Sequence, residues 1–384
     1  MGKPKIRFKG YADDWEQRKL DDVVEFLDTM RKPLEGVKRV YGPYPYYGAS
    51  GIVDYVDGYL FDEELILLSE DGANITDRNY PICFLATGKY WVNNHAHVLR
   101  TKQGNENNFI CNSLERKDYT QYNTGMAMPK LNKETCKKIP ILCPVFEEQK
   151  KIGDYFRGLD HLITLHQRKC DETKKLKKYM LQKMFPQNGE KVPKIRFAGF
   201  SDDWEQRKVG DITKELSEYA KLNSGLPLLT SARTGLMYQS DYRGNSTTDN
   251  ENTLFSIVPL NACTYRHMSD DSTFHINVNT LEKGLVSKEY PVFVENESDL
   301  RFVVQYINSS DSFTKFCTEQ KKGGTRTRLY YKTLCEYKML IPSLNEQHII
   351  ADYFDNLDYL ITLHQQKCDE LQNIKKFMLK NMFA

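Results

Sequence analysis

The sequence predicts an α+β protein built as a pseudo-twofold tandem repeat. We expect two mixed α/β domains, separated by two long helices that pair antiparallel as a coiled coil. Three observations predict this plan: a short motif occurs twice, a long helix-forming segment follows each copy, and the residues between them are unrelated. With 384 residues, the chain is long enough for two domains that each bury a core.

The first repeated block is a short motif near the start of each copy. Residues 4–19 contain Pro-Lys-Ile-Arg-Phe, a glycine and Asp-Asp-Trp-Glu-Gln-Arg-Lys, and the same 13 residues recur in 193–208 at an offset of 189. An internal repeat of this kind predicts a repeated architecture. It indicates that one structural unit is written twice.

The second repeated block recurs at a different offset. Residues 148–184 match 346–382 at 23 of 37 positions, 198 residues later. Between the blocks, residues 21–124 and 210–322 show no convincing similarity. Gene duplication with drift is one explanation, but uniform drift would not preserve the ends and erase the middles. We therefore favour middles that diverged because they perform different tasks.

Each second block is predicted to be a long amphipathic helix. No proline interrupts residues 147–184, and Pro144 and Pro186 flank them. Apolar residues alternate at spacings of four and three, which is the heptad pattern of a helix–helix seam. The predicted seam residues are Ile152, Phe156, Leu159 and Ile163, and in the second copy Ile350, Phe354, Leu357 and Ile361.

A helix of 37 residues is about 55 Å long. The repeated seam favours an antiparallel, self-complementary pair, although parallel packing is sterically open. Lysines on the first helix indicate a solvated face more than a nucleic-acid contact. The expected domains are residues 1–146 and 187–344, and the expected long helices lie in 147–186 and 345–384.

The variable segments contain strand-like stretches and polar, aromatic or basic loops. Residues 90–99, for example, resemble one strand. Arg, Asn, Ser and similar side chains contact bases and phosphates, although most domains carry such loops for structural reasons. The candidate DNA-binding residues are Tyr46, Tyr47, Ser50, Asn93, Asn94, His95, Ser231, Arg233, Tyr265, Arg266, His267, Arg326 and Arg328.

Composition and missing motifs exclude several functions. The net charge of +2 means that any basic footprint is local, and nine cysteines without paired spacing indicate reduced thiols. His95 and His97 could share a metal, but spacing places no third ligand, so we expect no metal site. No phosphate-loop or adenosylmethionine motif appears, so we expect no catalysis by this chain alone. Lacking a secretory signal and an apolar span, it is expected in the cytoplasm and not in a membrane.

The sequence resembles the specificity subunit of a Type I restriction-modification system. The resemblance covers essentially the whole chain. It rests on the repeated opening motif, the Glu-Gln pair that starts each long helix, and four stretches in the variable segments. These stretches are Tyr47-Gly48-Ala49-Ser50-Gly51, residues 91–97, Tyr265-Arg266-His267 and Gly323-Gly324-Thr325-Arg326.

The resemblance implies two target-recognition domains, each reading one half of a bipartite, asymmetric sequence in double-stranded DNA. It also implies that the two helices act as a spacer and dock two modification subunits. Those subunits would methylate adenine with adenosylmethionine, and two restriction subunits could add ATP- and Mg-dependent cleavage. This chain itself would bind no cofactor.

Two other hypotheses belong to different classes. The chain could be a non-catalytic coiled-coil scaffold that presents two protein-binding domains, which would show no sequence-selective DNA binding. It could also be an independent DNA-modifying enzyme, which the missing motifs disfavour. DNA methylation by the purified chain alone would support the latter.

Overall fold

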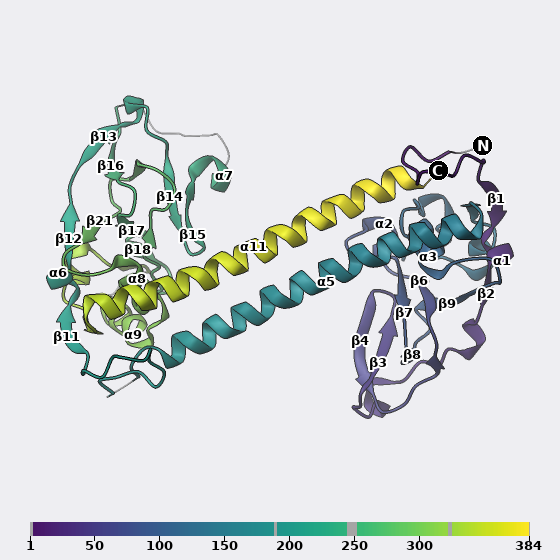
Figure 1. Cartoon of the computed structure of the whole chain (residues 1–384), viewed down its shortest axis with the longest axis horizontal. Coiled ribbons are helices and arrows are strands. Elements are labelled where there is room, and N and C mark those ends of the chain that lie inside the picture. The colour runs from purple at the N-terminus through teal and green to yellow at the C-terminus, as the bar shows by residue number, and fades with distance from the viewer. Residues whose placement is uncertain (1–2, 188–189, 244–251, 322–324, 384) are drawn as a thin grey trace. The chain divides into compact units, whose positions relative to one another are not determined.

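The structure is a computed structural model that describes residues 3–187, 190–243, 252–321 and 325–383. The chain forms two compact units (Figure 1). The first unit contains residues 1–168 and 364–384, and the second contains residues 169–363. Helices α5 (Phe146–Lys183) and α11 (Leu344–Met382) each contribute one part to each unit.

The first unit is mixed α/β. It contains two four-stranded sheets, ordered β2-β9-β6-β7 and β4-β3-β8-β5. One face of the first sheet packs against helix α3 (Asn107–Glu115) and the first part of α5, and its other face packs against the second sheet. The strands are β1 (Glu16–Lys19), β2 (Val24–Phe26), β3 (Tyr44–Gly48), β4 (Gly51–Val56), β5 (Phe61–Asp62), β6 (Leu65–Ser69), β7 (Cys83–Ala86), β8 (Lys89–Val92), β9 (Ala96–Thr101) and β10 (Pro140–Cys143). The short helices are α1 (Leu20–Val23), α2 (Asn74–Asp77), α3 (Asn107–Glu115) and α4 (Lys133–Cys136).

The second unit is also mixed α/β but has different sheets. One has four strands (β12-β21-β17-β19), one has three (β13-β16-β20), and two-stranded ribbons add to them. The strands are β11 (Glu205–Lys208), β12 (Thr213–Leu216), β13 (Tyr219–Lys221), β14 (Leu229–Ala232), β15 (Gly235–Tyr238), β16 (Leu254–Val258), β17 (Cys263–Thr264), β18 (Met268–Ser269), β19 (Asn277–Val278), β20 (Gly284–Ser287), β21 (Val292–Glu295), β22 (Thr327–Arg328) and β23 (Lys338–Ile341). The helices are α6 (Val209–Ile212), α7 (Gln239–Arg243), α8 (Leu300–Ser309), α9 (Asp311–Glu319) and α10 (Tyr331–Leu334).

The repeated motifs form the same structure in both units. We call residues 4–19 the first arm and residues 193–208 the second arm. The last strand of each arm pairs antiparallel with the strand before the long helix, β1 with β10 and β11 with β23. A one-turn helix follows each pair. Each unit therefore contains one copy of the repeated motif, with the same strand pairing in both copies.

A buried ion pair joins each arm to the start of a long helix. The Arg7 guanidinium donates to both carboxylate oxygens of Glu148 at 2.6 and 2.8 Å, and Arg196 does the same to Glu346 at 2.7 and 2.8 Å. The two carboxylates are 0% and 1% exposed. Carboxylates in the first turn of a helix also interact favourably with its dipole. The repeated Arg and Glu residues therefore join the arm of each unit to the start of a long helix.

The next residue in each helix, a glutamine, joins the variable segment to the start of the long helix. Gln149 donates to the carbonyl of Pro144 and accepts from the backbone N–H of Glu106. Gln347 repeats both contacts in the second unit, with Pro342 and Asp299. Because each glutamine satisfies groups from the variable segment, unrelated middles dock on the same helix start in the same manner.

The end of a long helix completes the core of each unit. In the second unit, the backbone N–H of Ile195 donates to the carbonyl of Lys183, at the end of α5. In the first unit, Ile6 makes the same bond to Asn381, at the end of α11. The two chain ends consequently lie beside one another in the first unit (Figure 1).

Most of the predicted seam residues contribute to the cores of the two units. Ile152, Phe156 and Leu159 are buried with Trp15, Phe109 and Phe383 in the first unit. In the second unit, Ile350, Phe354 and Leu357 are buried with Trp204, Phe302 and Phe185. Ile163 and Ile361 are half-buried. A heptad stripe thus packs against domain residues as well as against the other helix.

Polar contacts also join the two long helices within each unit. In the first unit, His166 Nδ1 lies 3.0 Å from His364 Nδ1, and Lys375 pairs with Asp160 at 2.5 Å. In the second unit, Lys177 pairs with Asp358 at 2.7 Å. In both units, a residue late in one helix contacts a residue early in the other, so the paired segments run antiparallel.

All nine thiols are free, and all but that of Cys335 are buried. Burial raises the pKa of the Cys143 thiol to about 11, so this group stays protonated. Among the described helices, none combines the length and apolar character that a membrane crossing requires.

Candidate nucleic-acid interface

The first unit brings two separate candidate stretches together. Strands β3 and β8 pair in parallel, with Tyr46 opposite Trp91 and Tyr47 opposite Val92. Both strands therefore end at the same edge of their sheet, and the Asn93 backbone N–H donates to the carbonyl of Tyr47 at 3.0 Å. Residues 48–50 lie at the end of β3 and residues 93–95 follow β8, so both segments lie at one edge of the sheet. Residues that the sequence separates by more than forty positions are neighbours here.

The prediction of one continuous strand over residues 90–99 is wrong. Strand β8 ends at Val92, β9 begins at Ala96, and residues 93–95 form a turn between them. The buried Asn93 side chain accepts from the His95 backbone N–H at 2.8 Å, which satisfies the turn locally. Asn94 is exposed at the tip, and its amide has no side-chain partner within the described part of the chain.

His95 and Asp71 lie beside this tip. The half-exposed His95 imidazole contacts the Asp71 carboxylate through Nδ1 at 2.8 Å. Ser50 is exposed at the turn between β3 and β4. Asn94, His95 and Ser50 therefore offer hydrogen-bonding groups to a ligand at one edge of the first unit.

His97 anchors the base of the same turn. Its Nδ1 lies 2.7 Å from Asp28, and its Nε2 lies 2.7 Å from the carbonyl of Leu131. Both neighbours are acceptors, so the ring is satisfied only as an imidazolium that donates twice. Burial lowers the pKa of His97, but the hydrogen bonds and charge of its neighbours outweigh burial and raise it to about 10. Neither ring nitrogen remains for the metal considered from the sequence.

Tyr46 and Tyr47 support the surface from beneath. Tyr46 is 1% exposed, and its hydroxyl accepts from the Leu34 backbone N–H at 3.0 Å. The Tyr47 ring stacks on Phe84, and burial raises the pKa of its hydroxyl. Tyr46 has no exposed face for a base, and Tyr47 is only partly accessible.

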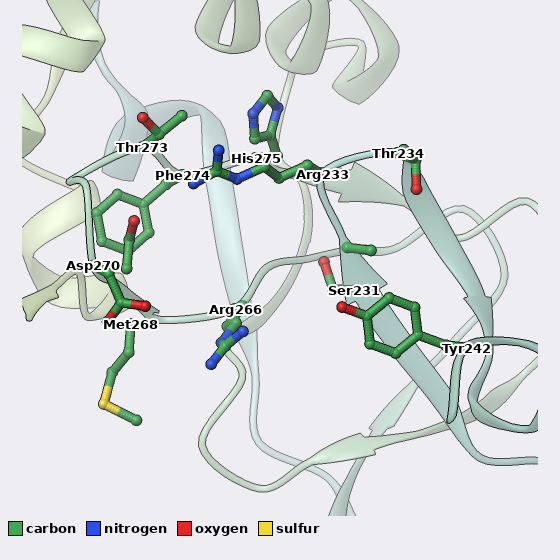
Figure 2. A pocket seen from close by; sticks show the side chains of 12 residues that line it. Ser231, Arg233, Thr234, Tyr242, Arg266, Met268, Asp270, Thr273, Phe274 and His275 are labelled. Atoms are coloured by element: carbon green, nitrogen blue, oxygen red, sulfur yellow. The ribbon is translucent and has the colours of Figure 1, made fainter. Parts of the chain in front are cut away.

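The second unit contains a hollow of about 320 Å³ at the tip of the β14–β15 ribbon (Figure 2). The Arg233 and Arg266 side chains both border it, from different loops. Its lining residues are Ser231, Ala232, Arg233, Thr234, Tyr242, Arg266, Met268, Ser269, Asp270, Thr273, Phe274 and His275. Three candidate residues, Ser231, Arg233 and Arg266, therefore border one concave surface.

Arg233 lies at the turn of the β14–β15 hairpin. It lies with Thr234 in the two-residue turn between β14 and β15. The Asn277 amide donates to Ser231 Oγ at 2.7 Å and to the Ala232 carbonyl at 2.9 Å, which fixes the base of the turn. Ser231 is buried by this contact, so it supports the tip.

Two other arginines of this region differ in their partners. Arg326 is exposed and pairs with Asp270 at 2.8 Å. Arg328 on β22 is exposed, and neither it nor Arg266 has a carboxylate or hydrogen-bond partner among the residues that the structure describes. Gly323 and Gly324, which the sequence places beside Arg326, lie outside the described residues.

Tyr265 and His267 point away from the surface. Tyr265 is 0% exposed and packs on Phe293 in the core. His267 is 4% exposed and stacks on Tyr330, and burial lowers the pKa of its imidazole, so the ring is neutral. Of the Tyr265-Arg266-His267 stretch, only Arg266 is exposed at the hollow.

Comparison with known proteins decides the family. Residues 12–175 and 271–373 match the family described as Type I restriction modification DNA specificity domain, and these ranges cover well over half of the chain. The chain belongs to this family. Its members recognise DNA sequences for restriction-modification systems, so this chain is a Type I specificity subunit that recognises DNA.

Similar proteins share nearly the full length of this specificity subunit. A type I restriction enzyme specificity subunit of Haemophilus influenzae is 28% identical over 90% of this chain and 88% of its own. The MjaVIII specificity subunit of Methanocaldococcus jannaschii is 20% identical over 95% and 91%. A crystal structure of the S subunit from M. genitalium aligns with a TM-score of 0.70, at 14% identity and 99% coverage of each chain, and so shares the fold.

Two acidic residues beside the candidate turns, one in each unit, were not predicted from the sequence. Asp71 lies beside His95, and Asp271 lies beside Arg233. Carboxylates are unexpected next to DNA, and Asp71 lies 24 residues from its partner, so neither motif nor composition indicates it. Turn-forming Ser-Asp-Asp-Ser at 269–272 was the available signal for Asp271.

Proposed function

We propose that this specificity subunit reads a bipartite, asymmetric site in double-stranded DNA, with one target-recognition domain in each unit. The first domain uses the edge formed by residues 48–50 and 93–95. The second uses the hollow at the β14–β15 tip. Each domain recognises a different half-site, because different side chains form the two surfaces.

The observation that carries this proposal is the contrast between the repeated and unrepeated parts. The pairs Arg7–Glu148 and Arg196–Glu346 have the same bidentate geometry within 0.1 Å. The sheets between them differ in strand number and order. Each unit therefore has the same repeated contacts but a different variable segment. This contrast supports two domains that are held alike and recognise different DNA sequences.

In this proposal, α5 and α11 form an antiparallel coiled coil that sets the distance between the half-sites. Half-sites about 34–36 Å apart lie on one face of B-DNA, and helices of 38 and 39 residues are long enough to span this distance. The paired charges Lys375–Asp160 and Lys177–Asp358 support the antiparallel register. The ruler and the domain limits 1–146, 147–186, 187–344 and 345–384 belong to the same proposal.

The proposal also includes the partner subunits. Two modification subunits would dock on the helices and methylate adenine with adenosylmethionine. Two restriction subunits would add ATP- and Mg-dependent cleavage. We propose no cofactor on this chain, which would act in the cytoplasm as a non-catalytic subunit.

Genome-wide mapping of methylated adenines tests the function. Cells would carry this gene with a modification subunit that co-purifies with its product, and control cells would carry the modification subunit alone. We expect adenine methylation at one bipartite motif only when both genes are present. Replacing residues 210–322 by the middle of another specificity subunit should change one half-site and leave the other intact. Failure to co-purify with a modification subunit, or methylation that ignores this gene, would refute the proposal.

A further inference from the structure

The tip of the β14–β15 ribbon has the form of a base-reading element. Ribbons of two strands fit the major groove of B-DNA. Arg233 and Thr234 are both exposed at the turn, and the Arg233 side chain is 62% exposed. The contacts of Asn277 with Ser231 and Ala232 hold the turn in place from below. Such preorganisation reduces the entropy lost on binding.

Asp271 fixes the orientation of the Arg233 guanidinium. Its Oδ2 accepts from Arg233 at 2.5 Å, and its Oδ1 accepts from Ser269 Oγ at 2.7 Å and from the Thr273 backbone N–H at 3.0 Å. The hydrogen bond from Ser269, followed by those from Arg233 and Thr273, lowers the pKa of Asp271, so the carboxylate is charged at neutral pH. Ser269 and Thr273 thus position the Asp271 carboxylate, and this carboxylate accepts the hydrogen bond from Arg233.

The same contact makes Arg233 a poor phosphate ligand. A phosphate bound to this guanidinium would lie close to the Asp271 carboxylate, and like charges repel. The Arg233–Asp271 pair is also neutral overall, so it gains little from releasing the counterions of DNA. Arg233 donates to Asp271 through one terminal nitrogen, and among the residues that the structure describes its other N–H groups have no acceptor.

The free N–H groups of Arg233 match guanine. In the major groove, guanine presents two acceptors, N7 and O6, whereas adenine presents one acceptor and one donor. A guanidinium donates only, so the two acceptors of guanine suit it best. Asp271 already accepts three hydrogen bonds and is less available to the amino groups of adenine or cytosine.

Arg266 offers a contrast on the same hollow. It is exposed, and within the described part of the chain no carboxylate neutralises it. A full positive charge without a partner suits a DNA phosphate, which contributes affinity but no sequence information. The two arginines that border the hollow therefore differ in their partners, since Arg233 is paired with Asp271 and Arg266 is not paired with a described carboxylate.

We propose that Arg233, oriented by Asp271, reads a guanine in the half-site of the second target-recognition domain, while Arg266 binds a backbone phosphate. This inference rests on the proposed function and adds to it a required G·C pair. Asp271 is a positioning residue, because it acts through Arg233.

Four variants of the full chain, each assembled with its modification subunit, test this division of tasks. The probes are the wild-type methylation motif in duplex DNA and duplexes with single base-pair changes in the second half-site. R233K keeps the charge but loses the planar fork. We expect discrimination at one G·C pair to fall roughly tenfold to hundredfold in R233K and R233A, with the other positions unchanged. R266A should weaken binding to all duplexes alike and reduce the salt slope by about one, whereas R266K should retain both.

A further variant, D271N, separates positioning from general structure. It should relax discrimination at the same base pair as R233A. It should also increase the salt dependence of non-specific binding, because the released arginine can reach a phosphate. A purely structural defect would not increase this salt dependence. Thermal unfolding of each variant is the check that it folds.

The outcomes distinguish the two levels of inference. If the wild-type complex has no bipartite motif, the proposed function fails. If the wild-type motif exists but R233K reads it unchanged, or if the affected position is an A·T pair, the assignment of Arg233 fails and the function stands. Uniform weakening in R233A would make Arg233 a phosphate contact, which also overturns the assignment.

Discussion

The rings of Trp15 and Phe383 lie 6.3 Å apart, edge to face, in the core of the first unit. Their counterparts in the second unit, Trp204 and Phe185, lie 6.4 Å apart in the same arrangement. Phe185 reaches its tryptophan across 19 residues, whereas Phe383 comes from the other end of the chain. The second long helix therefore completes a core that the first part of the chain leaves unfinished.

Replacing Phe383 by alanine should destabilise the first unit. Phe383 is 4% exposed and contacts Trp15, Phe109 and Phe156, so its loss leaves a cavity that costs about 3–5 kcal/mol. Chemical unfolding of the full chain measures this cost. The matched variant F185A should destabilise the second unit instead. If F383A leaves every unfolding transition unchanged, the terminal residues do not belong to the core.

Breaking the pair Arg7–Glu148 should cost more than breaking an exposed pair. R7M leaves a fully buried carboxylate without its partner, which costs about 3–5 kcal/mol. The control pair Lys208–Glu336 is 43% and 64% exposed, and K208M should cost far less than R7M because solvent screens an exposed ion pair. The double variant R7M/E148Q should recover part of the loss measured by urea unfolding. Equal costs for R7M and K208M would contradict the structural role of the repeated arginine.

Stability of the first unit should fall as the pH rises above neutrality. The pKa of His97 is about 10 in the folded chain and about 6.5 in an unfolded one. A raised pKa stabilises the fold fully below pH of about 6.5, and the contribution is lost as the pH approaches about 10. Urea unfolding between pH 6 and 10 measures the slope, which H97Q should flatten. A wild-type slope equal to that of H97Q would show that the pair with Asp28 carries no proton linkage.

Asn94 should determine one position of the half-site read by the first unit. N94A removes an exposed amide that can pair with adenine, so discrimination at one base pair should fall by about 1–3 kcal/mol. The fold should be unaffected, because the Asn94 side chain has no partner among the described residues. Methylation mapping identifies the relaxed position. If N94A changes the half-site assigned to the second unit, the proposed allocation of half-sites is incorrect.

Removing one matched heptad from α5 and α11, residues 167–173 and 365–371, should shorten the spacer of the DNA motif. Seven residues correspond to about 10 Å of helix, or about three base-pair steps. Both half-sites should persist while the number of unspecified base pairs falls. The same motif mapping reports both quantities, and altered half-sites with an unchanged spacer would refute the helical ruler.

The exposed or buried state of each candidate side chain could not be predicted from its local sequence. Tyr265, Arg266 and His267 are consecutive residues between β17 and β18, yet only Arg266 is exposed, because Tyr265 packs on Phe293 and His267 stacks on Tyr330. Composition marks a residue type that could contact DNA, but burial depends on contacts with distant parts of the chain.

The sequence by itself determined the repeat, the two long helices and the family. These features are local or periodic, so identical residues at fixed offsets and a heptad stripe reveal them directly. Only the tertiary structure decided what the repeated residues contact. It placed Phe383 on Trp15, Arg7 on Glu148 and Asp271 on Arg233. A heptad stripe defines an apolar face but not its partner, and a charged residue does not define its counter-ion, because both depend on which distant segments fold together.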